Sequence, residues 1–130
     1  MQIVLRSNYE SLSKLTHTID SLLDTLRVSD GVHVNVIVSL IEAVKNAIEH
    51  GNKLDEKRTI SIDYKATPEY LEFQVTDSGE GFEQERVPDP TAPENIAKEG
   101  GRGVFLMKKL ASQCEYNEKG NAVRLRFDLK

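Results

Sequence analysis

Three stretches of the sequence alternate apolar and polar residues, and they limit the fold more than any other feature. They lie at residues 60–65, 71–76 and 123–129, and residues 2–6 alternate in the same way. Because successive side chains of a strand point to opposite faces, such alternation gives a sheet with one buried and one solvated face. Helices must then cover a single face. The sequence therefore predicts an α+β two-layer sandwich with a mixed, mostly antiparallel sheet, not a doubly wound fold.

Two helices are expected between the first strand and the second. Leucine and isoleucine recur at helical spacing over residues 12–26, with Ser7 and Glu10 as a capping box at the start. Residues 29–31, Ser-Asp-Gly, are interpreted as a turn, and Gly51 as the stop of the second helix. The apolar arc of that second helix consists of Ile37, Leu40, Ile41, Val44, Ala47 and Ile48.

Composition indicates an ordinary globular protein with one domain and one core. The chain has 130 residues and a net charge of −4, so it carries no general electrostatic footprint for nucleic acid. No apolar run reaches the length of a membrane span, and the N-terminus lacks the pattern of a secretion signal. The single cysteine, Cys114, cannot form an internal disulfide, which suits the reducing cytoplasm. No nucleophile signature surrounds it, so we expect a small buried apolar residue there.

The second helix also carries a polar arc, made of Glu42, Asn46, Glu49 and His50. Glu42 and Asn46 are four residues apart, about 6 Å along a helix axis, so the carboxylate and the carboxamide share one side. A solvated helix face usually carries interchangeable lysines and glutamates. This combination instead indicates a binding surface, although spacing alone does not establish one. The histidines His17, His33 and His50 are too scattered to predict a zinc site.

A second polar feature follows a strand, in the stretch VTDSGEGF at residues 75–82. By strand parity Asp77 lies on the same core-facing side as Val75, where a carboxylate needs a hydrogen-bonding partner. Gly79 and Gly81 permit unusual backbone angles and the close approach of a flat ligand. The alternative interpretation is a glycine turn with a half-exposed aspartate at a strand end.

A third feature is the glycine-rich stretch EGGRGVFLMKKL, residues 99–110, which leads into a helix. Free N–H groups and the dipole at a helix N-terminus favour phosphate. A flexible loop joined to a core helix is the alternative, and there is no GxxxxGK[ST] motif, so a P-loop is excluded. Residues 82–100 hold three of the four prolines and lack a regular period, and connections of that length are usually functional or disordered.

Taken together and in this order, the three segments resemble the N, G1 and G2 boxes of the GHKL (Bergerat-fold) ATPases. The matching stretches are EAVKNAIEHG, DSGEGF and GGRGVFLM, and the resemblance covers nearly the whole chain. Within that superfamily the chain most resembles the small anti-sigma factor serine/threonine kinases of bacteria. The resemblance implies the histidine-kinase-type ATPase fold, with residues 1–130 as a single ATP-binding kinase domain and an ATP lid at about 82–100.

The resemblance also implies a role for each matching residue. Asn46 would hold Mg²⁺ against the triphosphate, and Glu42 would act as general base. Asp77 would accept a hydrogen bond from the adenine amino group, with the base against Gly79 and Gly81. The phosphates would be wrapped by Gly101, Arg102 and Gly103. His50 either contacts phosphate or caps the helix end, Arg102 faces either the γ-phosphate or solvent, and Glu49 is expected to face solvent.

The implied function is that of an ATP-binding regulator that phosphorylates a serine or threonine of an antagonist protein of the anti-anti-sigma type. It would also sequester a regulator such as a sigma factor. Mg²⁺, a homodimer and a cytoplasmic location are expected, without direct contact to nucleic acid or membrane. Two alternatives stay open, a nucleotide-sensing binding module without catalysis and a stand-alone histidine-kinase-like ATPase domain. For the latter, His17 is formally a phosphoacceptor candidate, although a helical histidine is more commonly just a surface residue.

Overall fold

The computed structural model describes residues 2–52, 57–77, 106–118 and 121–129. Residues 106–110 of this part are helical. The other elements, in chain order, are β1 (Gln2–Arg6), α1 (Glu10–Leu26), α2 (Asp30–Asn46), the π-helical turn η1 (Ala47–Gly51), β2 (Thr59–Ala66), β3 (Tyr70–Asp77), β4 (Gln113–Tyr116) and β5 (Ala122–Asp128).

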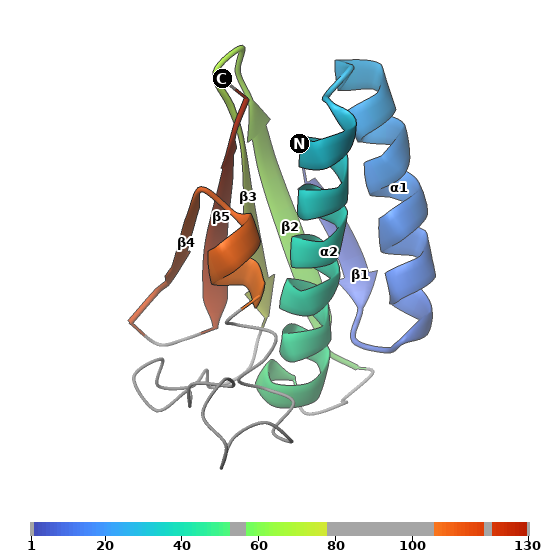
Figure 1. Ribbon diagram of the computed structural model, residues 1–130. Coiled ribbons are helices and arrows are strands. Elements are labelled where there is room, and N and C mark those ends of the chain that lie inside the picture. Colours follow the sequence, from blue (N-terminus) through green and yellow to red (C-terminus); the bar gives the residue numbers. More distant parts are fainter. Residues whose placement is uncertain (1, 53–56, 78–105, 119–120, 130) are drawn as a thin grey trace, which may run out of the picture.

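The strands form one sheet in the order β1-β2-β3-β5-β4, and every neighbouring pair in the described residues is antiparallel. Helices α1 and α2 lie side by side over one face of this sheet (Figure 1). The predicted two-layer α+β sandwich is therefore confirmed, whereas the described strand pairs are all antiparallel rather than mixed. The alternating stretches became β1, β2, β3 and β5, whereas the four-residue edge strand β4 was not predicted.

The core lies between the two layers. Phe73 in the central strand β3 is fully buried and packs edge-to-face against Phe127 of β5, with the ring centroids 6.2 Å apart. From the helices, the buried apolar side chains come at helical spacing, as expected. They are Leu15, Ile19 and Leu23 of α1, and Val36, Leu40, Ala43 and Val44 of α2.

Both predicted helix starts need correction. Helix α1 begins at Glu10 without a capping box, because the Ser7 side chain is buried and Asn8 Oδ1 accepts from the Ser11 N–H at 3.1 Å instead. Ser29 is the N-cap of α2, and its hydroxyl accepts from the Val32 N–H at 3.4 Å. Asp30 is thus the first helical residue rather than part of a turn, where its charge suits the helix dipole.

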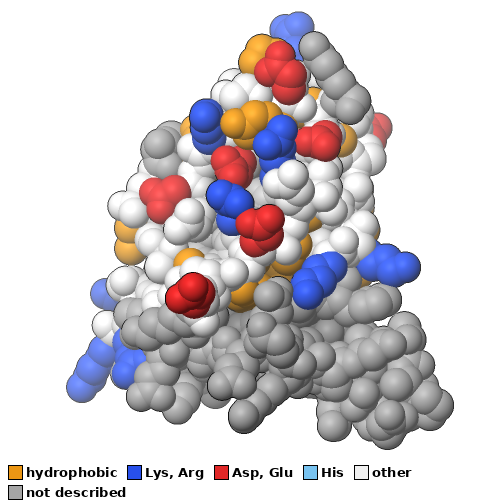
Figure 2. All heavy atoms as spheres, turned by 90° about the vertical axis from the view of Figure 1, so that its left-hand side faces the viewer, with side chains coloured by type: hydrophobic (Ala, Val, Ile, Leu, Met, Phe, Trp, Pro, Cys, Tyr) orange, Lys and Arg blue, Asp and Glu red, His pale blue; other side chains and the backbone are white. Residues whose placement is uncertain are grey.

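The outer face of the sheet carries paired charges on β3, β5 and β4. Arg124 bridges Glu72 at 3.3 Å and Glu115 at 2.6 Å, which links β3, β5 and β4. Arg126 lies over the Tyr70 ring, 3.8 Å from its centroid. Figure 2 shows acidic and basic side chains interspersed on this side. The face is solvated, as the alternation of the strands predicted.

One stretch of the described residues, Asp30–Glu49, is long and apolar enough to cross a membrane, with a mean hydropathy of 1.3. In this protein 44% of that window is buried, and α2 lies against the sheet. Its apolar character is therefore that of a helix packed in a protein core.

Candidate functional site

The C-terminal end of α2 is fastened to the sheet. After Asn46 the helix continues as the π-helical turn η1, a rare geometry that is frequent at functional sites. Asn52, fully buried, donates from its N–H to the Ala47 carbonyl at 2.7 Å and from Nδ2 to the Thr59 carbonyl at 3.1 Å. The end of the helix is thus held to the start of β2, which fixes Asn46 relative to the sheet.

Asn46, predicted on the polar arc opposite the apolar one, is buried, with 8% of its surface exposed. The reason is geometric, because Asn46 borders the stripe formed by Ala43 and Ala47 that faces the sheet. Its Nδ2 has no hydrogen-bond partner among the residues that the structure describes. A buried amide without a partner is costly, so this group calls for an explanation.

Asp77 is the last residue of β3 and lies on the core-facing side, as parity predicted. It pairs with the buried Ile60 of β2 and is itself half-buried. Its N–H donates to the Asn121 carbonyl at 2.9 Å, so the ladder toward β5 holds to the end of the strand. The carboxylate is therefore presented from a fixed backbone position.

Tyr116, at the end of β4, is a member of the site that the sequence analysis missed. Burial raises the pKa of its hydroxyl, the nearby polar Asn46 carboxamide lowers that pKa, and the charges of Cys114 and Asp77 raise it further. Tyr116 is thus close to both Asn46 and Asp77. Its alternation with Cys114 on the inner side of residues 113–116 was the only available signal, and it was too short to stand out.

Two glutamates lie on the same helix. Glu42 is half-buried one turn before Asn46, at the predicted spacing. Glu49, expected to face solvent, accepts a hydrogen bond from the Tyr9 hydroxyl at 2.7 Å. That bond ties η1 to the start of α1 and gives Glu49 a structural contact.

The remaining predicted site residues cannot be placed. Gly79, Gly81, Gly101, Arg102 and Gly103, together with the expected lid at 82–100, lie outside the described residues. The backbone of His50 belongs to η1, but its side chain also lies outside the described part.

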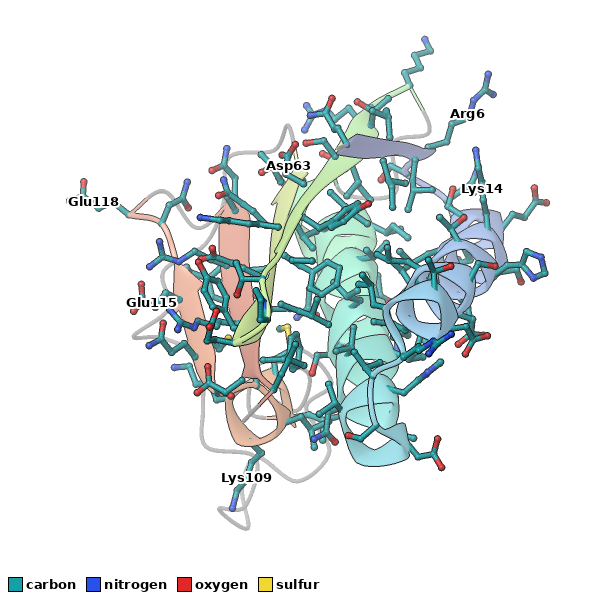
Figure 3. All side chains as sticks on the ribbon, turned by 90° about the horizontal axis from the view of Figure 1, so that it is seen from above. Arg6, Lys14, Asp63, Lys109, Glu115 and Glu118 are labelled. Carbon is teal, nitrogen blue, oxygen red and sulfur yellow. The ribbon has the colours of Figure 1, made fainter. Side chains whose placement is uncertain are left out.

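Three other residues, Cys114, Lys108 and Lys109, lie outside the predicted site, and Cys114, which was expected to be buried, is half-buried. Cys114 packs against the core, and burial raises the pKa of its thiol from 9.0 to about 11, which suits a structural residue. Lys108 and Lys109 are exposed, and Lys109 points away from the protein in Figure 3.

The groups around Asn46 that could bind a metal ion are oxygen atoms and amides. No group of three or more histidine, cysteine, aspartate or glutamate side chains within the described ranges could hold a metal ion by itself. Mg²⁺, however, is usually held by one or two protein oxygens together with the phosphates of a nucleotide. The Asn46 carboxamide fits that role through Oδ1, which supplies an oxygen ligand without adding charge.

The chain is similar in sequence to two serine-protein kinases over most of its length. The serine-protein kinase RsbW of Oceanobacillus iheyensis is 26% identical over 125 residues, which cover 92% of this chain and 78% of the relative. The serine-protein kinase RsbW of Listeria monocytogenes is 24% identical over 130 residues, covering 95% and 82%. The resemblance to the anti-sigma factor kinases is thus confirmed at modest identity.

Solved structures confirm the fold. The crystal structure of the RsbU and RsbW domains of a Mycobacterium tuberculosis protein matches with a TM-score of 0.64 at 12% identity and covers 100% of this chain. The histidine kinase domain of a blue-light activated kinase from Erythrobacter litoralis matches with a TM-score of 0.51 at 15% identity, over 91% of this chain. The chain spans 32% and 58% of those two solved chains.

A model of a protein family also matches the chain, over residues that the structure describes and over residues that it does not. The sequence profile of the histidine kinase-like ATPase domain matches residues 5–127, which is nearly the whole length. It includes all three boxes and both helices that cover the sheet. The chain therefore belongs to the histidine kinase-like ATPase domain family.

Proposed function

We propose that this chain is a single-domain, ATP-dependent serine/threonine protein kinase that phosphorylates an antagonist protein of the anti-anti-sigma type. It also sequesters a regulator such as a sigma factor. The relatives named serine-protein kinase RsbW support the choice of reaction, and the family supports the use of ATP. A cytoplasmic location and a homodimer belong to the same proposal.

One observation carries the nucleotide site. The buried Asn46 carboxamide stands where α2 passes into η1, and η1 contacts β3, the strand that ends 31 residues later at the Asp77 carboxylate. A carboxylate at a strand end can accept hydrogen bonds from the edge of a base. A carboxamide oxygen can bind a hard cation beside phosphates. Their convergence in one place is what an adenine nucleotide with its metal requires.

In this proposal each described residue has a defined task. Asp77 accepts a hydrogen bond from the adenine amino group, and Asn46 Oδ1 binds Mg²⁺. The metal, when bound, neutralises charge on the phosphates. Glu42, one helical turn earlier, accepts the proton from the attacking serine or threonine hydroxyl. The new bond joins that oxygen to the γ-phosphorus, the bond to the β-phosphate oxygen breaks, and ADP leaves.

The binding half of the proposal is tested by thermal unfolding with ATP or ADP, with and without Mg²⁺. A ligand at a hundredfold excess over its dissociation constant adds about 2.7 kcal/mol to the free energy of unfolding, or several degrees in melting temperature. We expect that rise in the native protein and its loss in Asn46→Ala and Asp77→Asn. Asn35→Ala, an asparagine substitution earlier on α2, is the matched control and should keep the rise. No rise in the native protein would refute nucleotide binding.

The catalytic half is tested by transfer of ³²P from γ-labelled ATP to a cognate antagonist protein. Glu42→Gln should reduce transfer by at least tenfold while leaving the nucleotide-induced melting shift intact. Glu118→Gln, an exposed glutamate that points away from the sheet in Figure 3, should transfer at the native rate. Full transfer by Glu42→Gln would remove Glu42 as the base. Nucleotide binding without any transfer would favour the non-catalytic binding module.

A further inference from the structure

We propose that Asn52 is a positioning residue that sets the distance between the two halves of the nucleotide site, Asn46 at the end of α2 and Asp77 at the end of β3. The inference rests on the proposed ATP site and adds to it a buried residue that follows η1. Its basis is a pair of hydrogen bonds, the burial of the Asn52 side chain and the register between β2 and β3.

On the helix side, Asn52 holds the turn that follows Asn46. Its N–H donates to the Ala47 carbonyl at 2.7 Å, across the five positions that a π-helical hydrogen bond spans. The Ala47 N–H in turn donates to the carbonyls of Ala43 and Val44. Ala47, which directly follows Asn46, is thus hydrogen-bonded through both its N–H and its carbonyl. The backbone that carries the Asn46 carboxamide therefore depends on where Asn52 lies.

On the sheet side, the same residue reaches the pair of strands that presents Asp77. Asn52 Nδ2 donates to the Thr59 carbonyl at 3.1 Å. Thr59 is followed by Ile60, which is the register partner of Asp77 in the ladder between β2 and β3. A single side-chain hydrogen bond therefore joins the end of the helix to the backbone beside the partner of Asp77.

Apolar packing alone defines this distance less sharply. Ile48 of η1 is fully buried and η1 contacts β3, but apolar contacts are not directional, so they resist a small shift along the strand less than a hydrogen bond does. Asn52 is itself fully buried, and a buried carboxamide is costly unless it is hydrogen-bonded. An apolar side chain would pack here without that cost. The directional bond to Thr59 accounts for a carboxamide at this position.

This arrangement has a consequence for the ligand, because ATP spans both halves of the site and its fragments occupy one half each. Adenosine needs only Asp77, and Mg–tripolyphosphate needs only Asn46. A ligand that joins two binding groups gains about 10²- to 10⁴-fold in affinity, provided that the two halves are held at the distance the ligand has. A change at Asn52 that alters this distance should therefore weaken ATP and leave each fragment nearly as before.

The test is Asn52→Ala, with Asn52→Ser as a milder variant whose donor lies one bond nearer the backbone. Thr67→Ala is the matched control. It removes a side chain that accepts from the Glu69 N–H at 3.2 Å and the Tyr70 N–H at 3.0 Å, in the turn at the end of the sheet opposite Asp77.

Dissociation constants of adenosine, Mg–tripolyphosphate and Mg–ATP are measured by ligand-detected NMR on each protein, at a temperature where its unfolding curve shows it folded. We expect both Asn52 variants to bind Mg–ATP about tenfold more weakly, which is part of the gain from joining the fragments. Each fragment should change less than twofold, and Thr67→Ala should match the native protein with all three ligands.

A further measurement uses the native protein alone. The Asn52 side-chain NH₂ protons, assigned by their loss in Asn52→Ser, should exchange slowly with D₂O, and fast exchange would overturn the bond to Thr59. Native affinity for Mg–ATP in both variants would overturn the positioning role. Equal weakening of ATP and both fragments would overturn it too, because a general packing defect acts on every ligand. A native protein that binds none of the three ligands refutes the proposed function itself, which is a separate result from native-like Asn52 variants.

Discussion

Cys114 illustrates how the inner face of the sheet controls the chemistry of single side chains. Burial raises the pKa of its thiol from 9.0 to about 11, so at pH 8 the reactive thiolate is roughly a hundredfold scarcer than in the unfolded chain. We expect iodoacetamide to modify the native protein far more slowly than the protein in 6 M guanidinium. Equal rates in the two states would show that the thiol is not shielded.

The same shift has a consequence for stability. The native thiol keeps its proton to a higher pH than the unfolded one, so between about pH 9 and 11 the unfolded state releases a proton first and the free energy of unfolding falls. Below pH 9 the contribution of this group is fully present. Cys114→Ala should therefore lose less melting temperature between pH 8 and 10.5 than the native protein does. The melting temperature that Cys114→Ala still loses has a contribution from Tyr116, because the raised pKa of its hydroxyl also lowers the free energy of unfolding as the pH rises.

Among the elements, the π-helical turn η1 is joined to the start of α1 by an exposed hydrogen bond. The hydrogen bond from Tyr9 to Glu49 joins it to the start of α1, and hydrogen bonds to charged groups at exposed positions contribute about 1 kcal/mol. Tyr9→Phe and Glu49→Gln should each lower the free energy of unfolding by about that amount. In a double-mutant cycle the two losses should not add. Additive losses would show that the contact contributes nothing in solution.

How well the elements could be predicted depended on the length of their pattern. Strands of seven or eight residues, such as β2 and β3, show several periods of alternation and were found from the sequence alone. Strand β4 has four residues and therefore only two inward positions, Cys114 and Tyr116, which cannot be told from chance. The sequence predicted where the helical segment that includes α2 ends. The burial of Asn46 depends on how closely that helix approaches the sheet, and the periodicity of the sequence carries no information on this distance.

For the whole molecule, the same limitation explains the incomplete site. The motif residues Glu42, Asn46 and Asp77 could be proposed for the site because each stands in a local pattern. The place of Tyr116 follows only from the order β3-β5-β4, in which β4 is the edge strand next to β5. Pairings between strands distant in sequence are a property of the assembled sheet, and no local stretch encodes them.

At this scale the proposed homodimer can be checked directly. Light scattering coupled to size exclusion should give about twice the chain mass of 14.6 kDa at micromolar concentration. The half-exposed Val4, 52% accessible on the edge strand β1, is an apolar residue that association could bury. A mass of one chain across the concentration range would refute the dimer.

The direction of the strands has a practical consequence for anyone handling this protein. Gln2 pairs with Asp63 in the middle of β2, and Asp128 pairs with Tyr70, whereas Asp77 stands at the other extremity of β3. Strand β1 therefore begins away from the end of the sheet that carries Asp77. Strand β5 finishes away from that same end (Figure 1). Fluorophores, affinity tags or surface tethers joined beyond Leu129 would be attached at the end of the sheet opposite the proposed nucleotide site, so immobilised protein should stay open to ligands in sensor experiments.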